Sequence, residues 1–296
     1  MPDSVSVVIP TYNYGRFIAA AIQSVLEQSS PAFEIIVIDD GSTDDTREVV
    51  GKFGDSVKYF RQENAGVSVA RNRGVEESSG ELIAFLDADD TWEATCLEAA
   101  VSKFAMDEQI GLVHWGLREF DSETGETIQF YLEGGEEGVA DNLLLWEGPM
   151  IAGHGAVIVT RQAYLDAGGF DTDTEPSEDW DFCYRVTRRF KVAFVPEPLV
   201  NYRSHTASAH CDIAKMERGM SRFYEKAFST DDKSLLMLRR RAYGNFHQVM
   251  AGSFFHNGEY ARSLSHAARS ILMRPGNIGY FLKFPIRRFA ARRDAD

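Results

Sequence analysis

Three carboxylates fall within four residues at the end of a short apolar segment. Residues 81–86 have the composition of a buried strand, and Asp87, Asp89 and Asp90 follow it directly. Like charges this close repel one another, and carboxylates are rarely buried without compensation. Mg²⁺ and Mn²⁺ prefer oxygen ligands and keep coordination positions open for phosphate oxygens. The cluster therefore predicts a metal–diphosphate site; the alternative is a solvated acidic turn that caps the next helix.

The segments that lead to this cluster alternate between strand and helix patterns. Strand-like runs end just before Asn13, Asp40 and Asp87. Such alternation predicts an α/β fold with a mostly parallel, doubly wound sheet, in which ligands bind outside the carboxyl ends of the strands. We therefore expect Asn13, Asp40 and residues 87–90 to share one cleft. The expected strands cover 5–10, 34–39, 57–60 and 81–86, and the helices between them cover 17–28, a segment ending at 53, and 67–77.

The totals exclude several classes of protein. The chain has 296 residues and a net charge of −14, which argues against general nucleic-acid binding. No apolar run approaches the roughly 20 residues that span a bilayer. The first residues lack the character of a signal peptide, and three widely separated cysteines fit reduced thiols. We therefore expect a cytoplasmic protein.

The pattern changes at Asp212. Residues 1–211 are predicted to form the α/β domain, and residues 212–296 a helical region with an antiparallel helix pair over 243–255 and 260–272. A basic tail closes the chain, in which residues 280–289 interleave aromatic and cationic side chains. This tail predicts either peripheral contact with the inner face of an anionic membrane or packing on the acidic main domain.

Five stretches of residues 4–208 together resemble the family 2 glycosyltransferases of the GT-A fold. Each stretch alone is weak, but their order along the chain is specific to that family. They are Val7–Asn13, Val37–Asp44, Asn64–Asn72, Phe85–Asp90, and Gly168-Gly169-Phe170 followed by Glu178-Asp179. The resemblance implies a GT-A domain and does not cover residues 212–296, where the sequence pattern itself predicts a C-terminal helical appendage.

The resemblance also implies a nucleotide-sugar donor, most often UDP-linked, and inversion at the anomeric carbon. Asp40 matches the carboxylate that reads the nucleobase, although an aspartate here also suits an Asx-turn or helix cap. Arg71 matches a position near the nucleotide that offsets phosphate charge; the alternative is an exposed helix arginine. The positions implied to bind the nucleotide are Pro10, Thr11, Tyr12, Asn13, Asp40, Asn64, Gly66, Arg71, Asp87 and Ala88.

The metal, Mn²⁺ or Mg²⁺, is implied at the Asp-x-Asp motif. Asp87 is assigned to the ribose and Asp89 to the metal, but the extra acid leaves Asp90 as a second candidate ligand. His205 matches a histidine that completes the metal shell, although an isolated histidine is more often a surface or hydrogen-bonded residue. The cation would neutralise charge that grows on the leaving diphosphate.

Asp179 matches the catalytic base of the family. Inversion by direct displacement requires a carboxylate that removes the acceptor proton, and a helix start keeps such a carboxylate ionised. The alternative is that residues 177–179 merely cap a helix. Glu178, Trp180 and His154 are predicted acceptor contacts, while a tryptophan at a helix start more often packs in the core.

Together these features predict a non-processive, inverting, metal-dependent transferase. It would move a sugar to a glycan, a lipid-linked saccharide or another hydroxyl, in surface polysaccharide or glycoconjugate assembly. The Gln-x-x-Arg-Trp signature of processive members does not occur. A nucleotidyltransferase is the first alternative, but residues 11–16 do not form its Gly-rich phosphate loop. An inactive glycan- or nucleotide-binding module is the second, although Asp179 and the Asp-x-Asp are intact.

Overall fold

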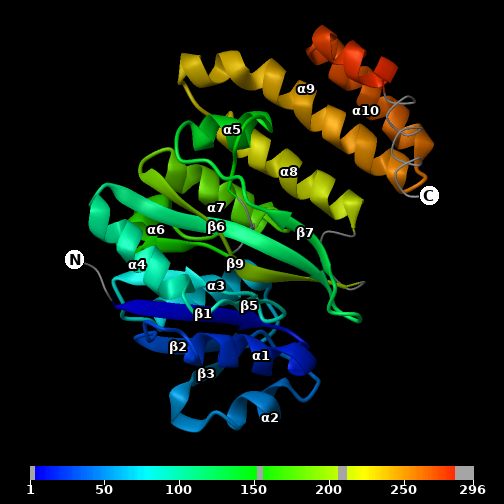
Figure 1. Cartoon of the computed structure of the whole chain (residues 1–296). Helices are drawn as coiled ribbons and strands as arrows, with labels where there is room; N and C mark the ends of the chain where they lie inside the picture. The colour runs from blue at the N-terminus through cyan, green and yellow to red at the C-terminus, as the bar shows by residue number, and fades with distance from the viewer. Residues whose placement is uncertain (1–3, 152–155, 206–211, 284–296) are drawn as a thin grey trace. The chain divides into compact units, whose positions relative to one another are not determined.

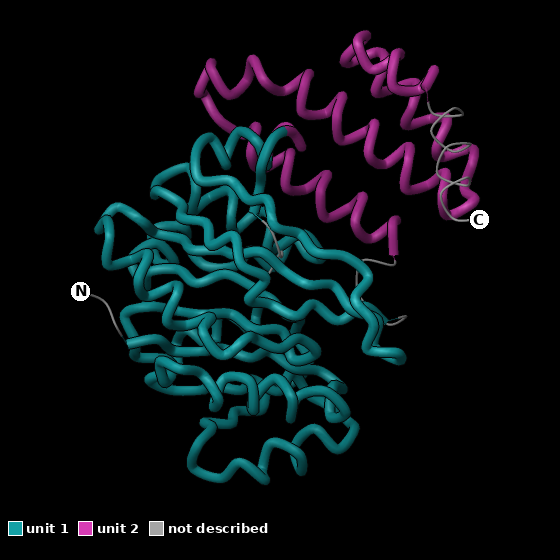
Figure 2. The backbone as a smooth tube through the Cα atoms, in the orientation of Figure 1, with its two compact units in different colours: residues 1–143, 148–211 teal, residues 144–147, 212–296 magenta. Residues whose placement is uncertain are grey.

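The computed structural model describes residues 4–151, 156–205 and 212–283. The chain forms two compact units, coloured separately in Figure 2. The first contains residues 1–143 and 148–211, and the second contains residues 144–147 and 212–296. Four residues from the middle of the chain thus belong with the C-terminal helices.

The first unit consists of alternating strands and helices (Figure 1). The mixed α/β architecture confirms the fold class expected from the sequence. Its elements are β1 Val5–Thr11, α1 Gly15–Leu26, β2 Glu34–Asp39, α2 Thr46–Gly51, η1 Gly54–Ser56, β3 Lys58–Arg61, α3 Val67–Glu76, β4 Leu82–Phe85, β5 Thr91–Trp92, α4 Cys96–Met106, β6 Ile110–Asp121, β7 Thr127–Tyr131, α5 Val139–Leu145, β8 Ile158–Thr160, α6 Arg161–Ala167, η2 Thr172–Thr174, α7 Glu178–Thr187 and β9 Lys191–Ser204. The last two residues of α5 belong to the second unit.

These strands form one sheet in the order β3-β2-β1-β4-β8-β6-β9-β5, with β7 paired to β6. The pairs β3–β2, β2–β1, β1–β4 and β6–β9 are parallel. β8 is antiparallel to both β4 and β6, so it joins the two parallel groups and keeps them running in the same direction. The carboxyl ends of β1, β2, β4 and β9 consequently meet at one edge of the sheet.

Helices bury both faces of the sheet, which explains why its central strands are apolar throughout. β1 and β2 are buried at every position. On one face, Val7 and Ile9 pack with Ile18 and Ile22 of α1 and with Leu97 of α4. The other face carries α3 and an aromatic cluster of Phe85, Tyr164, Phe170 and Phe182. This double cover holds the loops at the carboxyl edge in fixed positions.

The second unit is helical, as the change of pattern at Asp212 predicted. It contains α8 Ile213–Ala227, α9 Lys233–His256, α10 Tyr260–Met273 and η4 Pro275–Asn277. Residues 278–283 are again helical. α9 begins ten residues earlier than expected, because Asp232 accepts hydrogen bonds from the amides of Ser234 and Leu235 and so starts the helix there. Among the described residues, no helix is long and apolar enough to cross a membrane.

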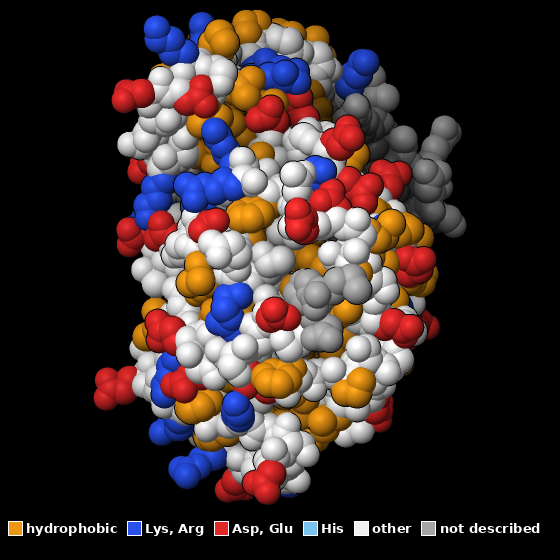
Figure 3. Space-filling model, turned by 90° about the vertical axis from the view of Figure 1, so that its left-hand side faces the viewer, with side chains coloured by type: hydrophobic (Ala, Val, Ile, Leu, Met, Phe, Trp, Pro, Cys, Tyr) orange, Lys and Arg blue, Asp and Glu red, His pale blue; other side chains and the backbone are white. Residues whose placement is uncertain are grey.

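One face of the molecule is shown in Figure 3. Acidic and basic side chains are both scattered over it, among polar atoms and smaller hydrophobic areas.

A buried histidine pair lies inside the second unit. His247 Nδ1 of α9 lies 3.0 Å from His266 Nδ1 of α10, and His266 Nε2 lies 3.1 Å from Glu217 Oε1 of α8. Burial lowers the pKa of both histidines, to about 4 for His247. The neutral pair can form a chain of hydrogen bonds in which His247 donates to His266 and His266 donates to Glu217.

We expect this unit to lose stability as the pH falls from about 6.5, the ordinary histidine pKa, toward 4. Across that range the unfolded chain binds protons that the folded histidines exclude. The loss should be on the order of 2 kcal/mol, with solvent screening allowed for. Calorimetric unfolding at several pH values measures it, with His247→Gln as the comparison. An identical pH dependence in wild type and His247→Gln would contradict this role for His247.

Candidate active site

The loop after β1 and the turn after β2 are joined by hydrogen bonds. The Asn13 amide donates to Ser42 Oγ over 2.9 Å, and the Thr43 amide donates to Asn13 Oδ1 over 2.8 Å. Asn13 has a φ of +58°, a left-handed conformation that asparagine tolerates better than most residues. Tyr12 beside it is 46% exposed, whereas Pro10 and Thr11 are buried. The sheet thus brings the first two sequence motifs together at its carboxyl edge.

Asp40 holds the loop that precedes α3. Its Oδ1 accepts hydrogen bonds from Gln62 Nε2 and the Ala65 amide, and its Oδ2 accepts one from the Gly66 amide, at 2.8–2.9 Å. Each carboxylate oxygen has two lone pairs, so these contacts leave acceptor capacity only at Oδ2. The predicted contact between Asp40 and a nucleobase has to use that oxygen. The same loop contains Asn64, which is exposed.

Asp40→Asn is expected to destabilise the protein by about 1–3 kcal/mol, because an amide cannot accept all three of these hydrogen bonds. Unfolding in urea measures this change. Asp45→Asn, at an exposed position in the same turn, serves as the control and should change the free energy of unfolding by less than about 0.5 kcal/mol. Equal stability of Asp40→Asn and wild type would show that the carboxylate does not hold the loop.

The three acids after β4 occupy different environments. The side chain of Asp87 is 36% exposed and that of Asp89 is 17% exposed, whereas Asp90 is buried. Asp90 Oδ1 accepts a hydrogen bond from the Arg203 amide at the end of β9. Asp89 Oδ2 lies 2.9 Å from His205 Nε2, one residue beyond the same strand. Asp87 and Asp89 are therefore the accessible acids, and Asp90 ties the motif to β9.

The negative charges of Asp87, Asp89 and Asp90 are not fully compensated by the groups around them. Burial and repulsion from neighbouring aspartates raise the pKa of Asp89 and of Asp90. Burial and the same carboxylates raise the pKa of Tyr14, whose hydroxyl is hydrogen bonded to Asp89. Within the described ranges, no three His, Cys, Asp or Glu side chains form a ready metal cage. This donor set fits a hard cation that takes one or two carboxylates and completes its shell with phosphate oxygens and water.

Arg71 links the acid cluster to α7. Its Nη2 lies 2.7 Å from Asp87 Oδ1, and its Nη1 lies 2.8 Å from Glu178 Oε1. The guanidinium also lies 5.1 Å from the ring centroid of Phe170. Arg71 is 3% exposed, so the alternative of an exposed helix arginine is wrong. The positive charge of Arg71 is thus paired with two carboxylates.

The first turn of α7 contains two acids, Glu178 and Asp179, in different environments. Glu178 is buried, and burial together with the charge of Asp179 raises its pKa to about 7 despite the contact with Arg71. Glu178 Oε2 has no hydrogen-bond partner among the described residues. Asp179 is half-buried, and its Oδ1 accepts a hydrogen bond from the Trp180 amide. Asp179 is therefore the accessible acid of the pair.

The predicted acceptor contacts have mixed placements. Trp180 is 7% exposed, and Glu178 is engaged by Arg71, so both pack inside the protein in this state. His154 lies outside the described residues. An acceptor role for any of the three stays a prediction.

Three residues that contact the site were not predicted from the sequence. Tyr14 and Arg203 both contact Asp89, the latter through its Nε and the Asp89 carbonyl. Glu175 accepts a hydrogen bond from the Ser68 amide in the first turn of α3, over 2.9 Å. Arg203 lies within the Tyr202–His205 stretch that drew attention to His205, but the contact between Glu175 and Ser68 joins residues 107 positions apart and has no local signal.

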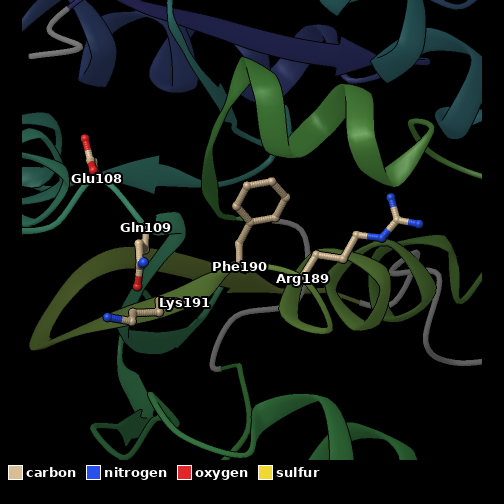
Figure 4. Close-up of a pocket in the computed structure, with 5 residues that line it drawn as sticks. All are labelled: Glu108, Gln109, Arg189, Phe190 and Lys191. Carbon is tan, nitrogen blue, oxygen red and sulfur yellow. The ribbon is translucent and has the colours of Figure 1, made fainter.

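A surface pocket lies at a different place in the first unit (Figure 4). It is lined by Glu108 and Gln109, just before β6, and by residues 189–191, where β9 begins. These are the amino ends of two parallel strands, opposite to the edge that carries the acid cluster. None of the predicted site residues lines this pocket.

The chain is similar to known proteins in sequence and in fold. Residues 6–181 match the sequence model of a family described as glycosyl transferase family 2. An uncharacterized glycosyltransferase of Nostoc sp. is 33% identical over 223 residues, which cover 71% of this chain and 67% of the relative.

Two solved structures share the fold. TarS 1–349 of S. aureus in complex with UDP-GlcNAc has a TM-score of 0.62 at 15% identity, and the match covers 92% of each chain. The mannosyltransferase PcManGT of Pyrobaculum calidifontis, in complex with GDP-Man and Mn²⁺, has a TM-score of 0.63 at 19% identity. That match covers 98% of this chain and 85% of the other. At these identities the likeness concerns the architecture.

Proposed function

The chain belongs to glycosyl transferase family 2, as its five motifs indicated, and from this membership and the geometry of the site we propose an inverting, metal-dependent transfer of one sugar. The donor is a sugar linked to a nucleoside diphosphate, most often UDP in this family. The acceptor is a hydroxyl of a glycan or of a lipid-linked saccharide. Transfer is non-processive, because the processive signature does not occur in the sequence.

The observation that carries the proposal is the double ion pair of Arg71. It joins Asp87 of the acid cluster to Glu178 of α7, and Asp179 is the next residue. One side chain thus spans the distance between the predicted donor site and the predicted base. A displacement needs these two parts on opposite sides of the reacting carbon, held at a fixed separation.

On the donor side, Asp89 with His205 beside it would hold the cation, and Asp87 would approach the ribose. When bound, the cation supplies positive charge at the diphosphate and so favours its departure. Asp90 keeps the motif in place through its hydrogen bond with the Arg203 amide. Residues 10–13 and the Asp40 turn enclose the nucleoside at the ends of β1 and β2.

Asp179 acts on the acceptor. Its carboxylate takes the proton of the attacking hydroxyl as the acceptor oxygen forms a bond to the anomeric carbon. The bond between that carbon and the diphosphate oxygen breaks in the same step, and the electron pair leaves with the nucleoside diphosphate. Attack from the opposite face inverts the configuration. Glu178 is the poorer base, because it is buried and paired with Arg71.

Calorimetric titration of UDP, GDP and dTDP, each with and without Mn²⁺, tests the donor site. The panel includes both uridine and guanosine because TarS and PcManGT were solved with nucleotides of each kind. We expect one nucleotide to bind in a metal-dependent manner. Absence of binding by all three, to protein shown to be folded, would refute the proposal and return residues 87–90 to an acidic turn.

A further inference from the structure

Helix α10 buries its polar face. Ser263, His266 and Ser270 are 8%, 3% and 0% exposed, and they are the buried residues of this helix. Ser263 Oγ donates to the Ala251 carbonyl and Ser270 Oγ donates to the Gly244 carbonyl, each over 2.8 Å. Hydrogen bonds between polar groups therefore help to hold α10 on α9, beside the half-buried Ala267 and Ile271.

Several apolar residues of α10 are exposed, although Tyr260 also contacts the Phe255 ring of α9 and Ala267 and Ile271 are half-buried. Tyr260, Leu264 and Leu272 are 58%, 71% and 74% exposed, and Ala268 between them is also exposed. Their spacing of four residues places them on one side of the helix. A helix on the surface of a soluble protein normally has the reverse arrangement, with its apolar stripe toward the core. The outer face of α10, formed by Leu264, Ala268 and Leu272, thus has the composition of a contact surface.

Every charged residue from Tyr260 to Arg293 is positive. This stretch contains eight Lys and Arg residues and no Asp or Glu. More widely, residues 212–296 contain sixteen Lys and Arg against eight Asp and Glu, in a chain whose net charge is −14. Arg269 on α10 and Lys283 beyond it are exposed, whereas Arg262 and Arg274 pair with Glu217 and Glu147.

We propose that the outer face of α10 docks on an anionic lipid surface. An amphipathic helix with an apolar side and only cationic charges lies in the interface of such a membrane and gains from both burial and attraction to the headgroups. A second copy of the chain fits the face less well, because a symmetric contact would set the same cationic residues against one another. A soluble acidic partner would satisfy Arg269 and Lys283 but not the leucines.

This inference concerns attachment and does not depend on the reaction. It fits a lipid-linked acceptor in the proposed function, but vesicle binding is measured without donor or acceptor. Failure of the vesicle experiment would leave the donor titration unaffected, and failure of the titration would leave vesicle binding unaffected.

The test is co-sedimentation of the full chain with phosphatidylcholine vesicles, with and without phosphatidylglycerol. We expect binding only to the anionic vesicles, weaker in high salt because the attraction is screened. The double variant Leu264→Gln and Leu272→Gln should bind at least about tenfold more weakly, since two leucines no longer enter the lipid. Leu165→Gln, at a leucine of α6 that is 60% exposed, is the matched control and should bind as wild type does.

The substituted positions are exposed, so the variants should fold; circular dichroism confirms this before binding is compared. Arg269→Glu should also weaken binding to anionic vesicles. Equal vesicle binding by wild type and the double-leucine variant would overturn the proposal. So would a wild-type dimer in analytical ultracentrifugation that the double variant disrupts, because the face would then be occupied by a second copy.

Discussion

Asp179→Asn is expected to slow sugar transfer by about 10²–10⁴-fold, because an amide cannot accept the proton of the attacking hydroxyl. The loss should appear in the rate of the chemical step and not in donor affinity. Asp179 is half-buried in the first turn of α7, and the donor residues are on the other side of the Arg71 bridge. Titration of the nucleoside diphosphate should therefore give the same affinity for the variant and for wild type.

Glu178→Gln is the informative comparison. Glu178 is buried against Arg71, and its Oε1 can be replaced by an amide oxygen that still accepts the hydrogen bond. We expect a change in thermal stability with transfer less affected than in Asp179→Asn. If Glu178→Gln abolished transfer and Asp179→Asn left it intact, the base would be Glu178 and the assignment would be wrong.

The pH dependence of transfer separates a base from a positioning residue. A carboxylate base must be ionised, so wild type should lose activity as the pH falls. The residual activity of Asp179→Asn should depend less steeply on pH on the acid side, where Glu178, whose pKa is raised to about 7, titrates in both proteins. An unchanged pH profile in the variant would indicate that Asp179 only shapes the site.

The grouping of site residues at the carboxyl edge of the sheet could be predicted from the sequence, because parallel strands end at the same edge. Once residues 5–11, 34–39 and 82–85 are recognised as parallel strands, Asn13, Asp40 and the acid cluster must follow them at one edge. The antiparallel strand β8 has no such signal. Its residues Ile158 and Val159 are apolar like their neighbours, and the direction of a strand is set by the connections around it.

The ion-pair partners of individual charged residues were harder to predict from the sequence. Arg71 bonds residues 16 and 107 positions away, so its burial depends on how α3, the β4 loop and α7 approach one another. The helical period of residues 260–272 likewise predicts α10 but not which side is buried. A surface helix is normally expected to bury its leucines. In α10, the side that carries Ser263 and Ser270 is buried instead, because both hydroxyls donate hydrogen bonds to α9.

Asp89→Asn is expected to remove the metal-dependent part of nucleoside diphosphate affinity, a loss of at least about a hundredfold. The asparagine is isosteric and keeps a hydrogen bond with His205 available, so folding should be preserved. Calorimetry with and without Mn²⁺ measures the effect directly, without an acceptor or a reaction. In the variant, the two titrations should give the same weak affinity.

Asp90→Asn distinguishes the two candidate ligands. Asp90 is buried, and it accepts a hydrogen bond from the Arg203 amide that an asparagine oxygen can also accept. The sequence alone left Asp89 and Asp90 as alternative ligands, and the greater exposure of Asp89 is the reason for proposing it. Asp90→Asn should keep the response to Mn²⁺ and change the nucleotide affinity only a few-fold. If instead Asp90→Asn lost the response while Asp89→Asn kept it, the buried acid would have to turn toward the diphosphate when the cation binds, and the hydrogen bond to β9 would have to break.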